Sequence, residues 1–173
     1  MADDVIQKKL AANPDISTQE LLAQSLPPQA SDKLQRVIHA SEQQHTGQIV
    51  LCIEARLSQD DTLKHASPRQ RALALFAELR VWDTEDNNGV MLYLLLEQHA
   101  IELIADRALN RCVAQTVWDT ITQRLAISLR AQQYENGLQS ALEQISGLLA
   151  AYFPSSTTRP RDNTVSDAPV LLP

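Results

Sequence analysis

The chain has 173 residues, a formal charge of −6 and two cysteines. This length suits one domain with a real core, because a domain of about 150 residues buries roughly two-thirds of its unfolded surface. The 15 Lys and Arg are scattered among 21 Asp and Glu, without the basic stripe of a nucleic-acid binder. No apolar run is long enough to span a bilayer and no signal peptide is evident, so we expect a cytoplasmic protein without membrane insertion.

The N-terminal region is polar and weakly helical. One helical pattern ends near Asn13-Pro14, a second runs from Ser17 to Leu26, and Pro27-Pro28 closes the region. Ser31 is predicted to be the N-cap of the next helix. Gly47 lies where that helix would end in a left-handed residue.

Three strands are predicted from apolar runs. Residues 49–53 are β-branched and aliphatic, residues 90–96 are apolar throughout, and residues 100–105 alternate more. Residues 97–99 form the hairpin turn between the last two. The second strand, which is entirely apolar, is expected to be central.

Helices and connections fill the remaining chain. Residues 57–65 are predicted to be a polar connection, and Ser67-Pro68 to start a helix that ends near Arg80. Two long amphipathic helices are expected after Asp106. The last 20 residues have no periodicity and are predicted to form a tail.

Chain direction brings distant polar residues together. More than 30 residues containing a helix join the first two strands, so these should be parallel. The hairpin makes the third strand antiparallel. Gln48, the loop 83–89 and Asp106-Arg107 should therefore meet at one edge of a small mixed α/β sheet. Open α/β proteins commonly bind ligands at a sheet edge.

This edge suggests a divalent-cation site. Oxygen ligands before a glycine turn can bind Ca²⁺ or Mg²⁺, and the candidates are Asp83, Glu85, Asp86 and Asp106. The alternatives are a solvated acidic loop for the first three and a helix N-cap for Asp106. A Ca²⁺-binding EF-hand is excluded by the spacing.

The other residues at this edge could also take part in binding. Gln48 and Asn87-Asn88-Gly89 could present amides to a ligand, or the latter could simply turn the chain into a buried strand. Arg107 could bind a phosphate or pair with an acid of the loop. No residue stands out as a nucleophile.

The histidines and cysteines do not indicate a metal site. His39, His45, His65 and His99 lack metal-ligand spacing and are expected at the surface. Cys52 and Cys112 are too far apart to suggest a thiolate metal site and are expected to be small core residues.

Several segments of this sequence resemble the corresponding segments of the TPM domain family, in particular of its soluble bacterial branch. The resemblance rests on Ala40-Ser41-Glu42 with Thr46-Gly47, Arg71-Ala72 with Phe76, the string from Arg80 to Val90, Ala105-Asp106-Arg107, and Phe153-Pro154. Branch members often have Glu where Gln48 stands and Gly where Ala108 stands. Losing that carboxylate would weaken a site for a hard cation.

The resemblance implies a three-layer α/β/α sandwich on a small mixed sheet. The resemblance covers about residues 34 to 155. From this coverage, the proline boundary and the composition of the last residues, we expect an N-terminal helical appendage over residues 1–28, a TPM-like domain over 29–153 and a flexible tail over 154–173. Some members have acid phosphatase activity, whereas others bind calcium or another divalent cation without demonstrated catalysis.

Two functions remain open at this stage. One is a metal-dependent, phosphatase-like hydrolase acting on a phosphomonoester. The other is a non-catalytic calcium-binding or accessory module whose acidic edge binds a basic protein partner.

Overall fold

The computed structural model describes residues 17–155 and 166–173. The first predicted helical pattern, near Asn13-Pro14, lies outside these residues. In chain order the elements are α2 (Thr18–Ser25), α3 (Pro28–Ser41), β1 (Ile49–Glu54), α4 (Gln59–Lys64), α5 (Pro68–Glu78), β2 (Val90–Leu95), β3 (Ala100–Ala105), α6 (Arg107–Cys112), α7 (Gln115–Arg130), α8 (Tyr134–Tyr152) and β4 (Val170–Leu172).

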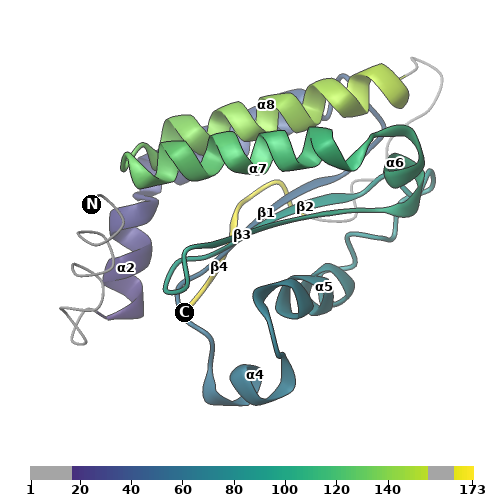
Figure 1. Cartoon of the computed structure of the whole chain (residues 1–173). Coiled ribbons are helices and arrows are strands. Elements are labelled where there is room, and N and C mark those ends of the chain that lie inside the picture. The colour runs from purple at the N-terminus through teal and green to yellow at the C-terminus, as the bar shows by residue number, and fades with distance from the viewer. Residues whose placement is uncertain (1–16, 156–165) are drawn as a thin grey trace.

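The fold has three layers, as predicted. A four-stranded sheet of order β3-β2-β1-β4 lies between helices. The long helices α7 and α8 cover one face, and α5 lies against the other (Figure 1). Helix α3 packs on the α8 side, where Leu34 and Ile38 join the larger core cluster.

Two cores follow from the alternation of strand side chains. Ile49, Leu51 and Ile53 point into the cluster below α7 and α8. Val50 and Cys52 point into the cluster that α5 covers. Every residue of β1 and β2 is buried, which explains their continuous apolar runs, because successive residues face opposite layers.

The predicted strand directions are confirmed. β1 and β2 are parallel, β2 and β3 are antiparallel, and β2 lies inside the sheet. The crossover between β1 and β2 contains α5, whose N-cap Ser67 accepts a hydrogen bond from the backbone of Gln70 as expected.

Helix α3 begins earlier than predicted. Pro28 is its first residue, and the carbonyl of Pro27 accepts hydrogen bonds from Ala30 and Ser31 at 2.9 and 3.0 Å. Proline is favourable at this position because its fixed φ suits the first helical turn. The prediction of Ser31 as N-cap was therefore wrong. The predicted C-cap role of Gly47 was also wrong, because α3 ends at Ser41 and no described glycine has positive φ.

Two short helices were not predicted. The polar connection 57–65 contains α4, whose N-cap Ser58 accepts a hydrogen bond from the backbone of Asp61. Helix α6 begins after Asp106 as expected but ends after six residues, and α7 starts separately. The Ser58 and Asp61 spacing was a readable capping signal.

The prediction of a tail over the last 20 residues missed a short strand. Its last residues form β4, which pairs in parallel with β1 from Cys52↔Val170 to Glu54↔Leu172. A three-residue strand is too short to show periodicity in sequence. It nevertheless covers the edge of β1, whose backbone would otherwise be an open template for pairing.

The burial of two side chains differs from the prediction. His45 is completely buried, with its Nδ1 3.1 Å from the carbonyl oxygen of Gly47. Cys112 is exposed, whereas Cys52 is buried as predicted. Among the described residues, no helix is both long and apolar enough to cross a membrane.

Candidate functional site

The predicted convergence of distant segments occurs at the edge where β1 and β2 begin. The amide of Val90 donates to the carbonyl of Gln48 at 2.8 Å, and the amide of Asp106 donates to the carbonyl of Gly89 at 2.8 Å. Gln48, Gly89 and Asp106 are thus neighbours across three strands. The sheet register alone brings them together, because β3 ends beside the start of β2.

The acidic loop before β2 is largely occupied by internal contacts. Asp83 forms an ion pair with Arg80 at 2.6 Å. Asp86 accepts a hydrogen bond from the Thr46 hydroxyl at 2.8 Å. Glu85 is exposed. The bond between Asp86 and Thr46 holds the loop against the chain that enters β1.

Asn87 connects the loop to α6. Its φ of 51° is left-handed, which asparagine tolerates better than most residues. Its backbone carbonyl accepts from Ala108, and its side-chain oxygen accepts from the Arg107 guanidinium at 2.5 and 3.0 Å. Arg107 therefore contacts an amide rather than the acid that the sequence suggested.

Asn88 is completely buried, and its side chain is half satisfied. Its Nδ2 donates to the Thr46 hydroxyl at 2.9 Å, but its Oδ1 is buried and has no hydrogen-bond partner within the described residues. Leaving such an acceptor unpaired costs about 1–3 kcal/mol. This oxygen therefore favours a ligand that brings a donor or a positive charge.

Asp106 presents a second oxygen of the same kind. Its Oδ1 accepts from the amide of Arg107 at 2.6 Å and caps α6. Its Oδ2 is buried without a hydrogen-bond partner in the described part of the chain. The cap and ligand readings are compatible, because each uses a different oxygen.

Gly89 lets the loop approach the rest of the fold closely. A Cβ on this residue would overlap the backbone carbonyl of Val81. The glycine is thus needed for space rather than for a left-handed conformation.

Gln48 is engaged with an acid that the sequence did not single out as a site residue. Its Nε2 donates to Oε1 of Glu42 at 3.0 Å, and the two residues are only 2 and 6% exposed. The amide thus stabilises a buried carboxylate at the same edge. A glutamate at position 48 would place two buried carboxylates in contact, which requires a cation or a proton between them.

The four predicted metal ligands do not form a ready cluster. Within residues 17–155 and 166–173, no group of three or more His, Cys, Asp and Glu could hold a metal ion. The two unpaired oxygens of Asn88 and Asp106 are the part of the predicted site that still requires a partner. Neutral amide and carboxylate oxygens are both ligands of Ca²⁺ and Mg²⁺.

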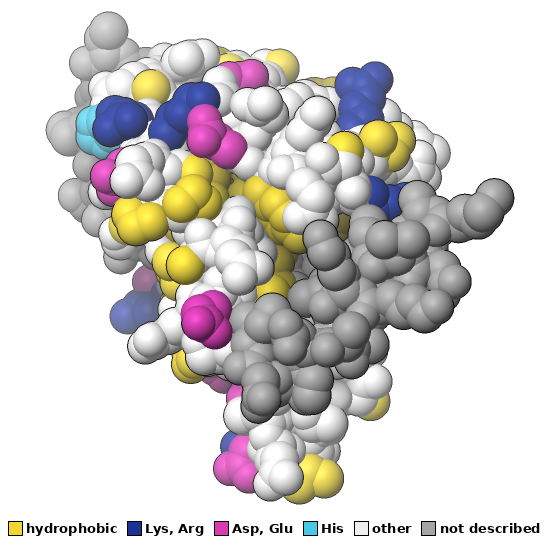
Figure 2. Space-filling model, turned by 90° about the vertical axis from the view of Figure 1, so that its left-hand side faces the viewer, with side chains coloured by type: hydrophobic (Ala, Val, Ile, Leu, Met, Phe, Trp, Pro, Cys, Tyr) yellow, Lys and Arg dark blue, Asp and Glu magenta, His cyan; other side chains and the backbone are white. Residues whose placement is uncertain are grey.

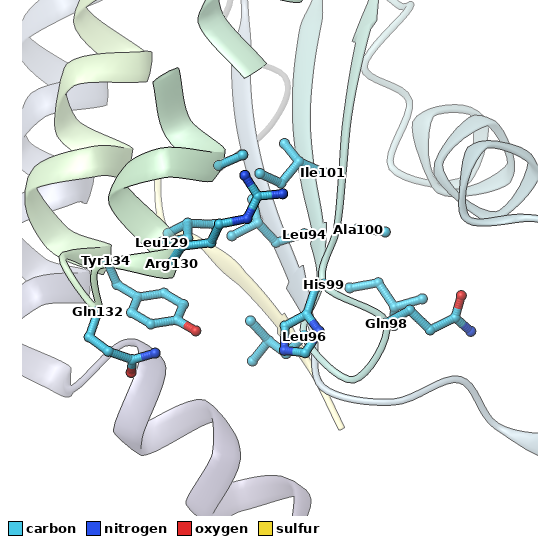
Figure 3. A pocket seen from close by; sticks show the side chains of 12 residues that line it. Leu94, Leu96, Gln98, His99, Ala100, Ile101, Leu129, Arg130, Gln132 and Tyr134 are labelled. Atoms are coloured by element: carbon cyan, nitrogen blue, oxygen red, sulfur yellow. The ribbon is translucent and has the colours of Figure 1, made fainter. Parts of the chain in front are cut away.

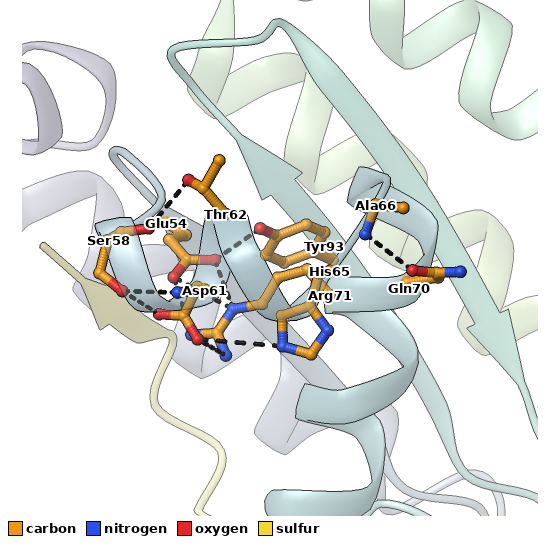
Figure 4. Close-up of polar contacts among 9 residues, drawn as sticks. All are labelled: Glu54, Ser58, Asp61, Thr62, His65, Ala66, Gln70, Arg71 and Tyr93. Carbon is orange, nitrogen blue, oxygen red and sulfur yellow. Dashed lines mark hydrogen bonds and ion pairs between the residues drawn. The ribbon is translucent and has the colours of Figure 1, made fainter.

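A second polar cluster lies at the opposite end of β1 and was not predicted (Figure 4). Glu54 is 3% exposed and accepts from Arg71 at 2.8 and 3.1 Å and from the Tyr93 hydroxyl at 2.5 Å. Arg71 also contacts Asp61 of α4 at 3.2 Å. The cluster joins β1, β2, α4 and α5.

The titration properties of this cluster follow from its burial. The bond to Glu54 raises the pKa of Arg71, and burial followed by the bond to Glu54 raises that of Tyr93 far above its ordinary value. Burial raises the pKa of the neighbouring Cys52 thiol to about 12. The hydrogen bond from Ser58 lowers the pKa of Asp61. The groups satisfy one another, which indicates a structural role.

The chain is similar to known proteins in both sequence and structure. A family model described as TPM domain matches residues 21–148. The NMR structure of the BA42 protein from the psychrophilic bacterium Bizionia argentinensis is similar, with a TM-score of 0.71 and 22% sequence identity, covering 84% of this chain and 94% of that one. None of the curated proteins matches the chain.

Proposed function

Since this chain belongs to the TPM domain family, we propose that it binds a divalent cation at the edge where β1 and β2 begin. The observation that supports this most strongly is the pair of buried, unpaired oxygens, Asn88 Oδ1 and Asp106 Oδ2. They lie on adjoining strand ends, joined by the hydrogen bond from Asp106 to Gly89. Two acceptors without donors favour a cation over an anion.

Calcium suits these ligands better than magnesium. Ca²⁺ accepts neutral amide oxygens and irregular geometry, whereas Mg²⁺ demands a near-ideal octahedron and keeps several waters. With a single carboxylate among the two unpaired oxygens, the expected Kd is about 10⁻⁴ to 10⁻³ M. The exposed Glu85 adds negative potential nearby.

Hydrolysis of phosphomonoesters is the second candidate function, because Arg107 adjoins the proposed cation site. Its guanidinium contacts Asn87, the residue before Asn88, and is exposed. A guanidinium is suited to bidentate phosphate recognition. A bound cation would supply polarisation of a phosphoryl oxygen.

Metal titration with thermal unfolding tests the binding proposal. At 100 times Kd, a ligand specific for the folded state stabilises by about 2.7 kcal/mol. For a chain of this size that is roughly 5–10 °C in Tm. We expect Ca²⁺ to produce this rise after treatment with a chelator, and Mg²⁺ to produce a smaller one.

Asp106→Asn removes one charge at the proposed site while asparagine still caps α6. The variant should fold and should lose the Ca²⁺ response. Asp60→Asn is the matched control, because Asp60 is an exposed acid at the other end of β1, on α4. Equal Ca²⁺ responses in the two variants would refute the proposed site.

An assay with para-nitrophenyl phosphate separates the two candidate functions. Metal-dependent turnover that is lost in Asp106→Asn supports the hydrolase. A Ca²⁺-dependent rise in Tm without turnover supports a non-catalytic calcium-binding module. Absence of both responses would leave the acidic edge as a contact surface for a basic protein partner and would refute cation binding.

A further inference from the structure

The C-terminal strand β4 forms one edge of the sheet, next to β1. It runs parallel to β1, and its three residues pair from Cys52↔Val170 to Glu54↔Leu172. The carbonyl of Leu172 also accepts a hydrogen bond from the amide of Ala55 at 2.9 Å. β4 is therefore attached as an added strand, in the same way that extended peptides bind to open sheet edges.

The side chains of β4 alternate between the core and the solvent. Val170 and Leu172 pack against the core cluster that α5 covers. Leu171, between them, is 41% exposed. The edge of β1 thus accepts apolar side chains at the first and third positions of an extended segment, because successive residues of a strand face opposite sides. The middle position contributes little to recognition.

The described contacts that hold the C-terminal segment in place are few. Within the described residues, β4 pairs with three of the six residues of β1, and parallel pairing is slightly less stable per residue than antiparallel pairing. Asp167 Oδ2 lies 2.8 Å from Nδ1 of His39 on α3, whose side chain is 68% exposed. The chain ends at Pro173, which is exposed. β4 can therefore leave the edge of β1 without breaking the pairing of β1 with β2 or of β2 with β3.

The connection that leads to β4 is longer than the distance that it bridges. It starts at Ser155, whose amide donates to the carbonyl of Gln44 at 3.0 Å, and it ends at Val170, opposite Cys52. Gln44 and Cys52 are at most about 30 Å apart, because a chain extends by no more than about 3.6 Å per residue. By the same measure the chain between Ser155 and Val170 can extend to roughly 50 Å. It is therefore long enough to reach β1 of a second molecule that packs against this edge.

Apolar surface lies at the end of the molecule where β4 terminates. The parallel strands β1, β2 and β4 all end on this side. A cavity of about 240 Å³ opens there, and Leu94, Leu96 and Leu129 are among the residues that line it (Figure 3). Figure 2 shows apolar side chains in a hollow on this side of the molecule. Two molecules that meet at this side would cover part of the apolar surface, which favours the pair over two separate chains.

We propose that β4 is an exchangeable strand and that the edge of β1 binds the C-terminal residues of a second copy of this chain. Two molecules exchange their last residues in a symmetric dimer, in which Val170 and Leu172 of each copy make in the other copy the contacts that they make within one chain. Such an exchange preserves every contact of β4. A tethered strand competes with a free one at an effective concentration of the order of millimolar. The dimer therefore forms at millimolar protein, and the monomer predominates at micromolar protein.

The molecular mass of the full chain in solution, measured by small-angle X-ray scattering, tests the exchange. We expect a monomer at about 10 μM and a dimer fraction above about one third at about 1 mM. A tenfold excess of the free peptide of residues 166–173 should return the dimer to monomer, because the peptide occupies the same edge of β1. A monomer at both concentrations would overturn the proposal. A dimer that persists in excess peptide would also overturn it, because the two copies would then associate through another surface.

Variants of β4 locate the contact. The double variant Val170→Asp and Leu172→Asp should lose the dimer, because it would place two charges in the apolar cluster under α5. Leu171→Asp is the matched control, since its side chain is exposed on the same strand, and it should keep the dimer. Equal dimer fractions in the two variants would refute the assignment.

The double variant also leaves its own edge of β1 open. A fluorescently labelled peptide of residues 166–173 should therefore bind to it at least tenfold more tightly than to the native chain, as fluorescence anisotropy would show. Equal affinities would refute the assignment, and if the double variant does not fold, the peptide competition on the native chain decides. Asp106→Asn should dimerise like the native chain, so this test is independent of the cation proposal.

Discussion

Replacement of Arg71 by methionine tests whether the cluster at the end of β1 stabilises the fold. Glu54 is 3% exposed and Arg71 is 8% exposed. Methionine fills much of the volume of arginine but removes its charge, which leaves the Glu54 carboxylate buried without its cation. Removing one partner of a buried ion pair destabilises by about 3–5 kcal/mol. For a chain of this size that is roughly 6–20 °C in Tm.

Equilibrium unfolding in urea, followed by far-ultraviolet circular dichroism, measures this loss. Adding Glu54→Gln to Arg71→Met should recover about 1–3 kcal/mol, because the buried charge disappears while an acceptor remains for Tyr93. Arg69→Met is the control, since the side chain of Arg69 is 52% exposed and pairs with Glu102. Its expected cost is about 0–1 kcal/mol. A loss below about 1 kcal/mol for Arg71→Met, or a double variant less stable than the single one, would refute the reasoning.

Three further predictions concern small residues. Gly89→Ala should destabilise the fold by at least about 2 kcal/mol in urea unfolding, because its Cβ would overlap the carbonyl of Val81. Gly147→Ala in α8 should stabilise the fold by about 1 kcal/mol, because a Cβ there would meet nothing within 4 Å. Equal effects of the two substitutions would contradict this. A thiol reagent should label Cys112 rapidly in the native protein and Cys52 only on unfolding, as mass spectrometry of the labelled peptides would show. The pKa of Cys52 is raised to about 12 in the folded protein, so the folded thiol stays neutral while the unfolded thiol ionises above about pH 8.5. The contribution of this thiol to folding stability is therefore complete below about pH 8.5 and is lost as the pH rises. Stability should therefore fall by up to about 1.4 kcal/mol per unit between pH 9 and 10, with a shallower slope in Cys52→Ala, and an unchanged slope would contradict this assignment.

The strands β1, β2 and β3 could be predicted from sequence because they are short apolar runs bounded by polar connections or a hairpin turn. β3 was predicted with its observed bounds, and the length of the crossover fixed the parallel pairing of β1 and β2. β4 could not be predicted, because three residues carry no period and pair only with a strand more than 100 positions earlier. Helix α4 carried a signal in Ser58 and Asp61 that its polar composition obscured.

For the candidate site, the sequence predicted which segments would meet but not which of their atoms would lack hydrogen-bond partners. Chain direction was enough to place Gln48, Gly89 and Asp106 together. Which oxygens remain unpaired depends on neighbours such as Thr46, which satisfies only the amide nitrogen of Asn88. The Glu54 and Arg71 pair likewise became visible only in three dimensions, because the crossover brings α5 under β1.

The position of the proposed cation site departs from the usual rule for open α/β sheets. Ligands in such proteins generally bind beyond the carboxyl ends of parallel strands. Here the site lies at the amino ends of β1 and β2, and it exists because the antiparallel β3 brings its own carboxyl end, with Asp106, to that edge. The carboxyl ends of β1 and β2 instead lie near the Glu54 cluster on the α5 side and near a cavity lined by Leu94, Leu96 and Leu129 on the α7 side. If the reversed strand decides where the cation binds, Ca²⁺ binding should depend on Asp106; if the usual rule governs this fold, it should depend on an acid at the other end of β1, such as Asp60 of α4. Measuring Ca²⁺ binding in Asp106→Asn and in Asp60→Asn therefore tests each end of the sheet against the other.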